Sequence, residues 1–148
     1  MRVLNELLAN RVLWVAVVGW FVAQALKVVF TYIIERRWDF GRFFGLGGMP
    51  SSHSAVVCGV ATAVGIARGF YSIEFTMAFV TASVVMTDAA GVRRAAGKQA
   101  VVLNKIVQDM AAGGLNFSNE ALKELLGHTP FEVLMGALLG VLLAVLIM

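Results

Sequence analysis

The feature that most constrains this chain is an apolar stretch at residues 12–34. The stretch is 23 residues long. As an α-helix it would rise about 34 Å, enough to cross the ~30 Å hydrocarbon core of a bilayer. Gln24 and Lys27 are its strongly polar residues. The stretch therefore predicts a transmembrane helix.

A secretory signal peptide is the alternative interpretation of the same stretch. Arg2 and Arg11 precede it, and Ala23-Gln24-Ala25 resembles a small-residue cleavage site. The apolar pattern resumes beyond that site, however, and continues to Ile34. A retained membrane span is the interpretation we favour.

Three further apolar segments follow, at residues 51–67, 72–92 and 130–147. With the first stretch they predict an all-α membrane bundle of about four transmembrane helices, formed by residues 1–148 as a single domain. The segments at 51–67 and 72–92 reach a spanning length only if polar residues at their ends are included. Polar residues at the edge of a span are themselves a sign of function.

Composition supports a membrane protein and argues against a nucleic-acid partner. The chain is 59% hydrophobic and 14% charged, whereas soluble domains are about half apolar and a quarter charged. The net charge of +3 is small, and like charges run no further than the pairs Arg36-Arg37 and Arg93-Arg94. Cys58 is the single cysteine, so no disulfide forms within one chain.

Residues 95–127 form the polar interval between the last two segments. Apolar residues recur there at helical spacing, which predicts an amphipathic helix along the membrane surface. In the last segment, Gly136 and Gly140 form a G-x-x-x-G pattern. Such a pattern favours close helix packing. Both a homodimer through this face and packing within one chain remain open.

Alternating spans predict which residues share a face of the membrane. Residues 35–50 and 88–130 would lie on one face, and the termini and the turn at 68–74 on the other. Eight cations fall on the first face: Arg36, Arg37, Arg42, Arg93, Arg94, Lys98, Lys105 and Lys123. The positive-inside rule predicts that this face is the cytoplasmic one. The membrane would be the cell membrane, or the inner membrane in a cell that has two.

The same face holds polar residues that are not required to form a membrane bundle. Both histidines of the chain fall there, His53 and His128, together with Asp88 and Glu132. Lys27 would reach this face by extending its side chain from the first span. Pro50 and Pro130 each suit the first turn of a helix, so two helix N-termini would point at the cluster. Helix N-termini bind anions, phosphate above all.

With cations for the phosphate charge and two imidazoles, this cluster could perform phosphoryl transfer. One histidine would attack phosphorus while the other protonates the leaving alkoxide. A metal site formed by His53, His128 and Asp88 is the competing chemistry. We disfavour it because the surrounding cations would repel a divalent ion and because no metal-ligand spacing such as H-x-x-x-H is present.

The segments "MPSSHS", "GVRR" and "LGHTPFE" resemble the type-2 phosphatidic acid phosphatase and vanadium haloperoxidase superfamily. The likeness is greatest to its divergent branch of small membrane proteins and extends from about Lys27 to Gly140. Ser52 stands where the wider superfamily has glycine, and a long interval separates Arg94 from His128. The resemblance implies a lipid phosphatase that needs no metal or other cofactor.

The resemblance also implies roles for individual residues. His128 would be the nucleophile that forms a phosphohistidine, Glu132 the carboxylate that orients it, and His53 the general acid. Asp88 would play a supporting part. The phosphate would be bound by five residues: Lys27, Ser51, Ser52, Arg93 and Arg94.

Each of these residues also has a structural explanation. Thr129-Pro130-Phe131-Glu132 is a capping box, which explains Glu132 without catalysis. Ser51 and Ser52 could cap a helix, Lys27 could extend to lipid headgroups, and Asp88 could pair with Arg93 or a lysine. Arg93 and Arg94 could be interfacial anchors. A protein that binds or translocates a lipid phosphate without hydrolysis is the alternative function.

Overall fold

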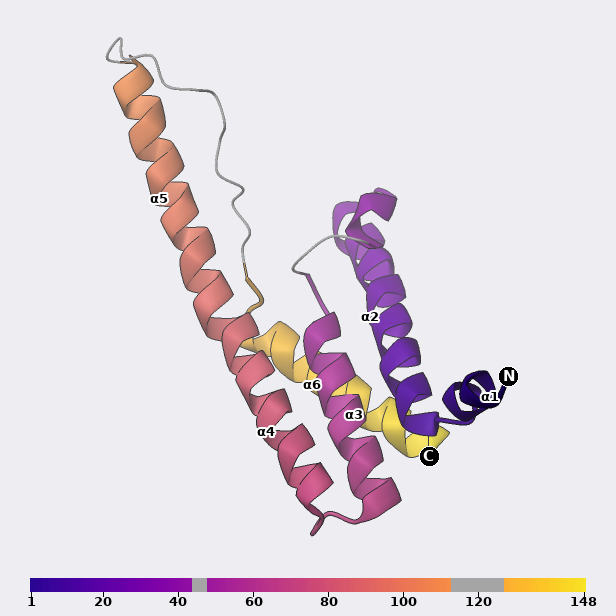
Figure 1. Cartoon of the computed structure of the whole chain (residues 1–148). Coiled ribbons are helices and arrows are strands. Elements are labelled where there is room, and N and C mark those ends of the chain that lie inside the picture. Colours follow the sequence, from indigo (N-terminus) through magenta and orange to yellow (C-terminus); the bar gives the residue numbers. More distant parts are fainter. Residues whose placement is uncertain (44–47, 113–126) are drawn as a thin grey trace.

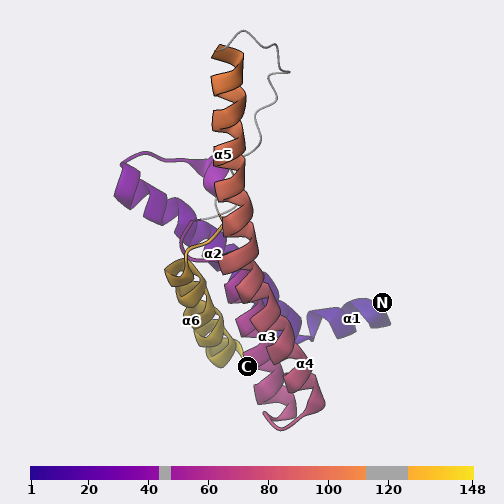
Figure 2. The same ribbon diagram turned by 90° about the vertical axis from the view of Figure 1, so that its left-hand side faces the viewer.

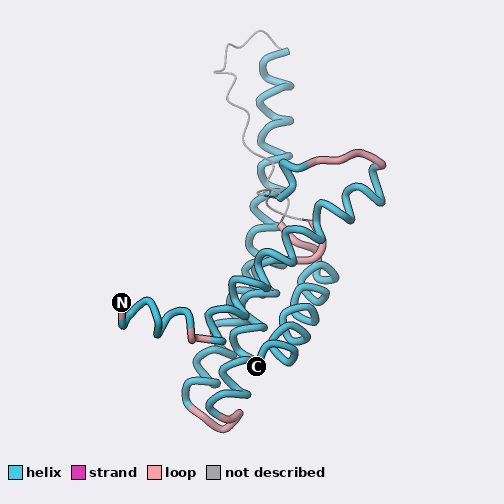
Figure 3. The backbone as a smooth tube through the Cα atoms, turned by 90° about the vertical axis from the view of Figure 1, so that its right-hand side faces the viewer, coloured by secondary structure: helices cyan, strands magenta, loops and turns pink. Residues whose placement is uncertain are grey.

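The computed structural model describes residues 1–43, 48–112 and 127–148, and it gives no account of the side chains of Arg42, Arg93, Arg94, Asp109, Ala111 and Ala112. Every regular element within these ranges is a helix, and no strand occurs among them (Figures 1 and 3). The all-α fold class is confirmed.

Three helices of the described part are long and apolar enough to cross a membrane. They are α2 (Arg11–Glu35), the continuous helix Ile73–Gln108, and α6 (Pro130–Ile147). Helix α3 (Ser52–Arg68) has 17 residues and is about 26 Å long, somewhat short for a span. The membrane bundle is therefore confirmed, whereas the count of four spans is not.

Helix α2 begins and ends at clear local signals. The Asn10 side chain accepts a hydrogen bond from the Leu13 backbone N–H (3.1 Å) and so caps the helix. At the other end Arg36 adopts a left-handed conformation with φ of 55°, which stops further winding. The short helix α1 (Arg2–Leu8) precedes α2 and lies off to the side of the bundle (Figure 2).

Helix α3 lies at the centre and packs against α2, α4 and α6. Its buried positions are small residues, among them Gly59, Ala61, Ala63 and Gly65. A Cβ added at Gly59 would lie only 3.0 Å from the Val15 side chain and 3.2 Å from the Gly140 carbonyl oxygen. The small residues therefore let two neighbouring helices approach the backbone of α3.

The G-x-x-x-G pattern of α6 packs on α3 of the same chain. A Cβ at Gly136 would collide with the Ser51 carbonyl oxygen, and one at Gly140 with the Ala55 carbonyl oxygen. Packing within one chain, one of the two alternatives from the sequence, is thus present. The homodimer stays a prediction.

Helix α4 (Ile73–Thr87) continues without a break into α5 (Arg93–Ala112) through a π-helical turn, η2 (Asp88–Val92). The two helices form one rod in Figure 1, and α5 extends beyond the rest of the bundle. The sequence pattern predicts instead a separate helix along the membrane surface. No proline interrupts residues 73–112, so the backbone keeps its helical hydrogen bonds across the change from apolar to polar sequence. The part of that interval at residues 113–126 lies outside the described ranges.

Different elements and contacts are found at the two ends of the bundle. At one end, which also holds the turn between α3 and α4, the Arg11 guanidinium donates to the Met148 carbonyl oxygen (2.9 Å). At the opposite end the start of α3, η2 and the start of α6 meet. Two backbone hydrogen bonds join them, from the Ser51 N–H to the Glu132 carbonyl oxygen (3.0 Å) and from the His128 N–H to the Ala89 carbonyl oxygen (3.1 Å). We call this second end the site end.

Candidate functional site

Three serines at the start of α3 form the base of the site. Ser51 caps the helix, since its Oγ accepts from the Ser54 backbone N–H (3.4 Å) and from the Ser54 hydroxyl (3.1 Å). Ser51 and Ser54 are fully buried, and Ser52 is nearly so. The structural explanation of Ser51 as a helix cap is confirmed, and the cap also fixes the positive end of α3 at the site.

Lys27 points from α2 into the bundle and is only 4% exposed. Its Nζ donates to Ser52 Oγ at 3.4 Å, and the negative charge of the Glu132 carboxylate attracts the ammonium. A cavity of about 190 Å³ opens beside it and is also lined by Gly48, Met49 and Glu132. A buried ammonium next to hydroxyls and a small cavity is suited to an anion.

His128 is held by its backbone and its ring just before α6. Its backbone N–H bonds to the Ala89 carbonyl oxygen (3.1 Å), and its Nδ1 lies 3.2 Å from Glu132 Oε2. The residue is 3% exposed. Because a carboxylate only accepts hydrogen bonds, the contact assigns a proton to Nδ1 and makes Nε2 the ring nitrogen that can supply a lone pair.

Glu132 performs two tasks with one carboxylate. Its Oε2 accepts from the Thr129 backbone N–H (3.1 Å), while the Glu132 N–H donates to Thr129 Oγ1 (3.3 Å). This is the capping box expected from the sequence. The same oxygen contacts His128, so the structural explanation and the orienting contact coexist.

Burial lowers the pKa of His128 below its ordinary value of about 6.5. The hydrogen bond and negative charge of Glu132 oppose this effect, and the positive charge of Lys27 adds to it. Since burial dominates, the imidazole is neutral over most of the physiological range. A neutral imidazole is the nucleophilic form.

His53 lies beside His128, with ring centroids 6.0 Å apart and ring planes at 66°. It is half-buried on the first turn of α3. The two histidines are 75 positions apart in the sequence, yet the packing of the bundle brings their rings together at the site end.

Asp88, Arg93 and Arg94 belong to the η2 and α5 segment. Asp88 is the first residue of η2 and is half-buried, one residue before the Ala89 carbonyl that accepts from His128. Arg93 and Arg94 begin α5, but their side chains lie outside the described part. Phosphate binding by the arginines and pairing of Asp88 with Arg93 therefore stay predictions.

Gln24 is a residue of interest that the sequence reasoning did not assign to the site. It is 5% exposed, and its Oε1 has no hydrogen-bond partner among the described residues. It lies three residues before Lys27, a spacing that places both on one face of α2. The sequence signal for Gln24 was a polar residue in the middle of the apolar stretch at residues 12–34.

As for metal binding, no group of three or more histidine, cysteine or carboxylate side chains assembles within the described ranges.

The helices and the buried polar cluster define a class, a polytopic helical membrane protein with a polar site at one end of the bundle. Comparison with protein families then identifies it more closely. Residues 8–143 match the divergent PAP2 family, and the chain belongs to this family. The resemblance stated from the sequence is confirmed.

A relative in Bacillus subtilis (strain 168) shows how much of the chain is shared. The uncharacterized membrane protein YuiD is 40% identical over 156 aligned positions, which cover 96% of each chain. Comparison with solved structures finds no match. The family and the relative establish a membrane protein of PAP2-related type.

Proposed function

We propose that the protein hydrolyses a lipid phosphate through a phosphohistidine intermediate. The observation that carries the proposal is the buried His128, whose Nδ1 is held by Glu132 so that Nε2 is the nitrogen left to attack. Lys27, the serines at the start of α3 and His53 border the same region. Substrates would be phosphatidate, phosphatidylglycerophosphate, or isoprenyl phosphates and diphosphates.

In the first proposed step, His128 Nε2 attacks phosphorus and the P–O bond to the lipid breaks. His53 donates a proton to the departing oxygen, so a monophosphate leaves an alcohol and a diphosphate leaves the lipid monophosphate. Glu132 stabilises the positive charge that develops on the His128 ring. Lys27, Ser51, Ser52 and the N-terminus of α3 bind the phosphate oxygens as their charge increases.

In the second step, water attacks the phosphohistidine and the P–N bond breaks. His53, now neutral, takes a proton from that water, so the enzyme returns to its starting state and inorganic phosphate leaves. Arg93 and Arg94 would reach the phosphate from the start of α5, with Asp88 in support. The cations and the helix N-terminus meet the phosphate charge, so the mechanism requires no metal ion.

Binding or translocation of a lipid phosphate without hydrolysis is the second candidate function. The buried Lys27–Ser52 contact favours it, because an ammonium and a hydroxyl can hold a phosphate without any histidine chemistry. In that case substitution of His128 would leave ligand binding intact.

For localisation we propose a multi-pass cell membrane protein, in the inner membrane where there are two, with the site end on the cytoplasmic side. This orientation rests on the excess of Lys and Arg in the segments predicted for that face, residues 35–50 and 88–130. A homodimer remains part of the proposal.

The deciding experiment measures phosphate release by the purified protein in detergent from each substrate class, without added metal. We expect His128→Ala and His53→Ala to abolish release, whereas Glu74→Gln, a carboxylate at the opposite end of the bundle, leaves it unchanged. Release that survives His128→Ala would refute the assigned nucleophile. Binding of the lipid without release would favour the second function.

The leaving group separates the two histidines. An aryl phosphate releases a phenolate that needs little protonation, so His53→Ala should retain much more of its kcat/KM, which reports the first step, on an aryl phosphate than on an alkyl phosphate. His128→Ala should fail on both. Equal losses in His53→Ala on the two substrates would remove His53 from the role of general acid.

A further inference from the structure

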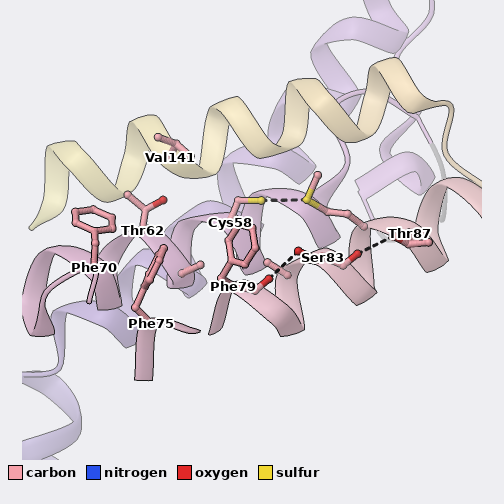
Figure 4. Close-up of a pocket in the computed structure, with 11 residues that line it drawn as sticks. Cys58, Thr62, Phe70, Phe75, Phe79, Ser83, Thr87 and Val141 are labelled. Atoms are coloured by element: carbon pink, nitrogen blue, oxygen red, sulfur yellow. Dashed lines mark hydrogen bonds between the residues drawn. The ribbon is translucent and has the colours of Figure 1, made fainter. Parts of the chain in front are cut away.

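A groove runs down the membrane part of the bundle between α4 and α6 (Figure 4). Its volume is about 570 Å³, within the ~300–1,000 Å³ typical of ligand pockets. The floor comes from α3 through Cys58, Ala61 and Thr62, one wall from α4, and the other wall from α6 through Val141. None of the described residues that line it is charged.

The polar atoms along the groove offer little to a polar ligand. The Ser83 hydroxyl donates to the Phe79 carbonyl oxygen (2.9 Å), and the Thr87 hydroxyl donates to the Ser83 carbonyl oxygen (2.8 Å). Both hydroxyl protons are thus used within α4. The Cys58 thiol contacts Met86 Sδ (3.3 Å), and Thr62 is the remaining polar side chain among the described residues of the lining. Phenylalanine rings at positions 70, 75 and 79 supply much of the remaining surface. The lining suits a hydrocarbon.

One end of the groove lies next to the candidate site. Met86 and Thr87 line that end, and Thr87 is the last residue before η2. Two residues further on, the Ala89 carbonyl accepts the hydrogen bond from the His128 backbone. From Phe75 to Thr87 the groove follows about 18 Å of helix, close to the ~15 Å depth of one leaflet.

From these observations we propose that the groove binds one hydrocarbon chain of the lipid phosphate, with its headgroup at His128 and its tail between α4 and α6. The inference rests on the proposed function and specifies its substrate class. A phosphate ester with a single long chain is a sufficient ligand, because the groove is one channel. The second chain of a diacyl lipid would remain in the bilayer.

The test uses photo-crosslinking, so its readout does not depend on hydrolysis. The probe is hexadecyl phosphate with a diazirine at mid-chain, added to the protein in nanodiscs, and the labelled residues are mapped by mass spectrometry. We expect labels on groove residues of α3, α4 and α6, with loss of labelling when unlabelled hexadecyl phosphate is added. Hexadecanol, which lacks the phosphate, should compete much less.

Two variants block the groove from different walls, Thr62→Phe on α3 and Ser83→Phe on α4. We expect both to lose groove labelling and to lose hydrolysis of hexadecyl phosphate, while hydrolysis of a water-soluble aryl phosphate is retained. The aryl phosphate also verifies that each variant is folded. Val80→Phe, on the same helix but outside the groove and 54% exposed, is the matched control and should behave as the unmodified protein.

The outcomes distinguish this inference from the proposed function. Groove labelling without any hydrolysis would support the tail site and refute the phosphatase. Hydrolysis with labels only on outward-facing residues of the bundle would refute the tail site and leave the phosphatase standing. A dimer that breaks up in Ser83→Phe, with no lipid labelling in the dimer, would assign the groove to a second copy and refute the inference.

Discussion

Glu132 connects three parts of the candidate site through different atoms. Its carboxylate contacts His128 Nδ1 and the Thr129 N–H, and its carbonyl oxygen accepts from the Ser51 N–H. The nucleophile proposed here, the N-terminus of α6 and the N-terminus of α3 are therefore all fixed relative to one residue.

Phosphate release should fall at acidic pH because protonation removes the His128 lone pair. Burial lowers the pKa of His128, so the acid limb of the kcat/KM profile should have its midpoint below about 6.5. Glu132 raises this pKa. Glu132→Gln should therefore move the acid limb to still lower pH while reducing the rate. An acid limb above 6.5, or one that moves upward in Glu132→Gln, would contradict the assignment.

The same protonation affects stability with a defined sign. An unfolded chain has an ordinary His128 pKa and so binds the proton more readily than the folded protein. Stability should therefore decrease as the pH falls from about 6.5 toward the lowered pKa of the folded state. His128→Gln should reduce this dependence, measured as the unfolding temperature across the pH range.

Replacing Gln24 by leucine should not destabilise the protein. Its Oε1 is buried without a hydrogen-bond partner in the described part of the chain, and such a group costs about 1–3 kcal/mol. We expect Gln24→Leu to raise thermal stability in detergent, with the exposed Gln99→Leu as the matched control. A clear loss of stability in Gln24→Leu alone would mean that the amide has an essential partner.

Glycines determine how closely α6 approaches α3. Gly136 leaves no room for a Cβ beside the Ser51 carbonyl oxygen, and Gly140 leaves none beside the Ala55 carbonyl oxygen. A side chain at either position would push the start of α6 away from the start of α3. His128 would then move away from the serines.

Gly136→Ala and Gly140→Ala should each destabilise the protein by about 1–3 kcal/mol, the usual cost of overpacking. The matched control is Gly91→Ala in η2, where an added Cβ would meet nothing within 4 Å. Thermal unfolding in detergent gives the comparison. If the α6 variants were as stable as the Gly91 variant, α6 would have to pack differently from the arrangement described here.

Most element boundaries could be predicted from the sequence, because apolar length and proline position are local signals. A span is expected at residues 130–147, and α6 is Pro130–Ile147. The continuation of α4 into α5 is not predicted, since hydropathy changes at residue 93 while the helical backbone does not. The serine cap and the capping box follow from local sequence. The 6.0 Å approach of His53 to His128 does not, because it depends on how α3 and α6 pack.

The bundle has one polar end and one end that holds the C-terminus and the turn between α3 and α4 (Figure 1). The direction of each helix follows from this arrangement. α2 runs toward the site end, α3 runs away from it, α4 returns, and α6 runs away again. Because α2 and the continuous helix Ile73–Gln108 are both candidate spans, we expect the connecting helix α3 to cross the membrane between them.

Cysteine labelling tests this arrangement. In a Cys58→Ser background, we expect Phe40→Cys and Tyr71→Cys to react with a membrane-impermeant thiol reagent from opposite sides, because both residues are exposed at different ends of the bundle. The positive-inside rule predicts the cytoplasmic side for position 40. Labelling of both from one side would show that α3 does not span the bilayer.

The capping box at the start of α6 has a consequence for how the site forms. The carboxylate that closes the first turn of α6 is the one that assigns the proton on His128. The ring therefore acquires its tautomer only when the helix winds, and fraying of that one turn would release helix end and imidazole together. In the proposed mechanism, the order of a single helical turn determines whether the lone pair on His128 Nε2 is available to attack phosphorus.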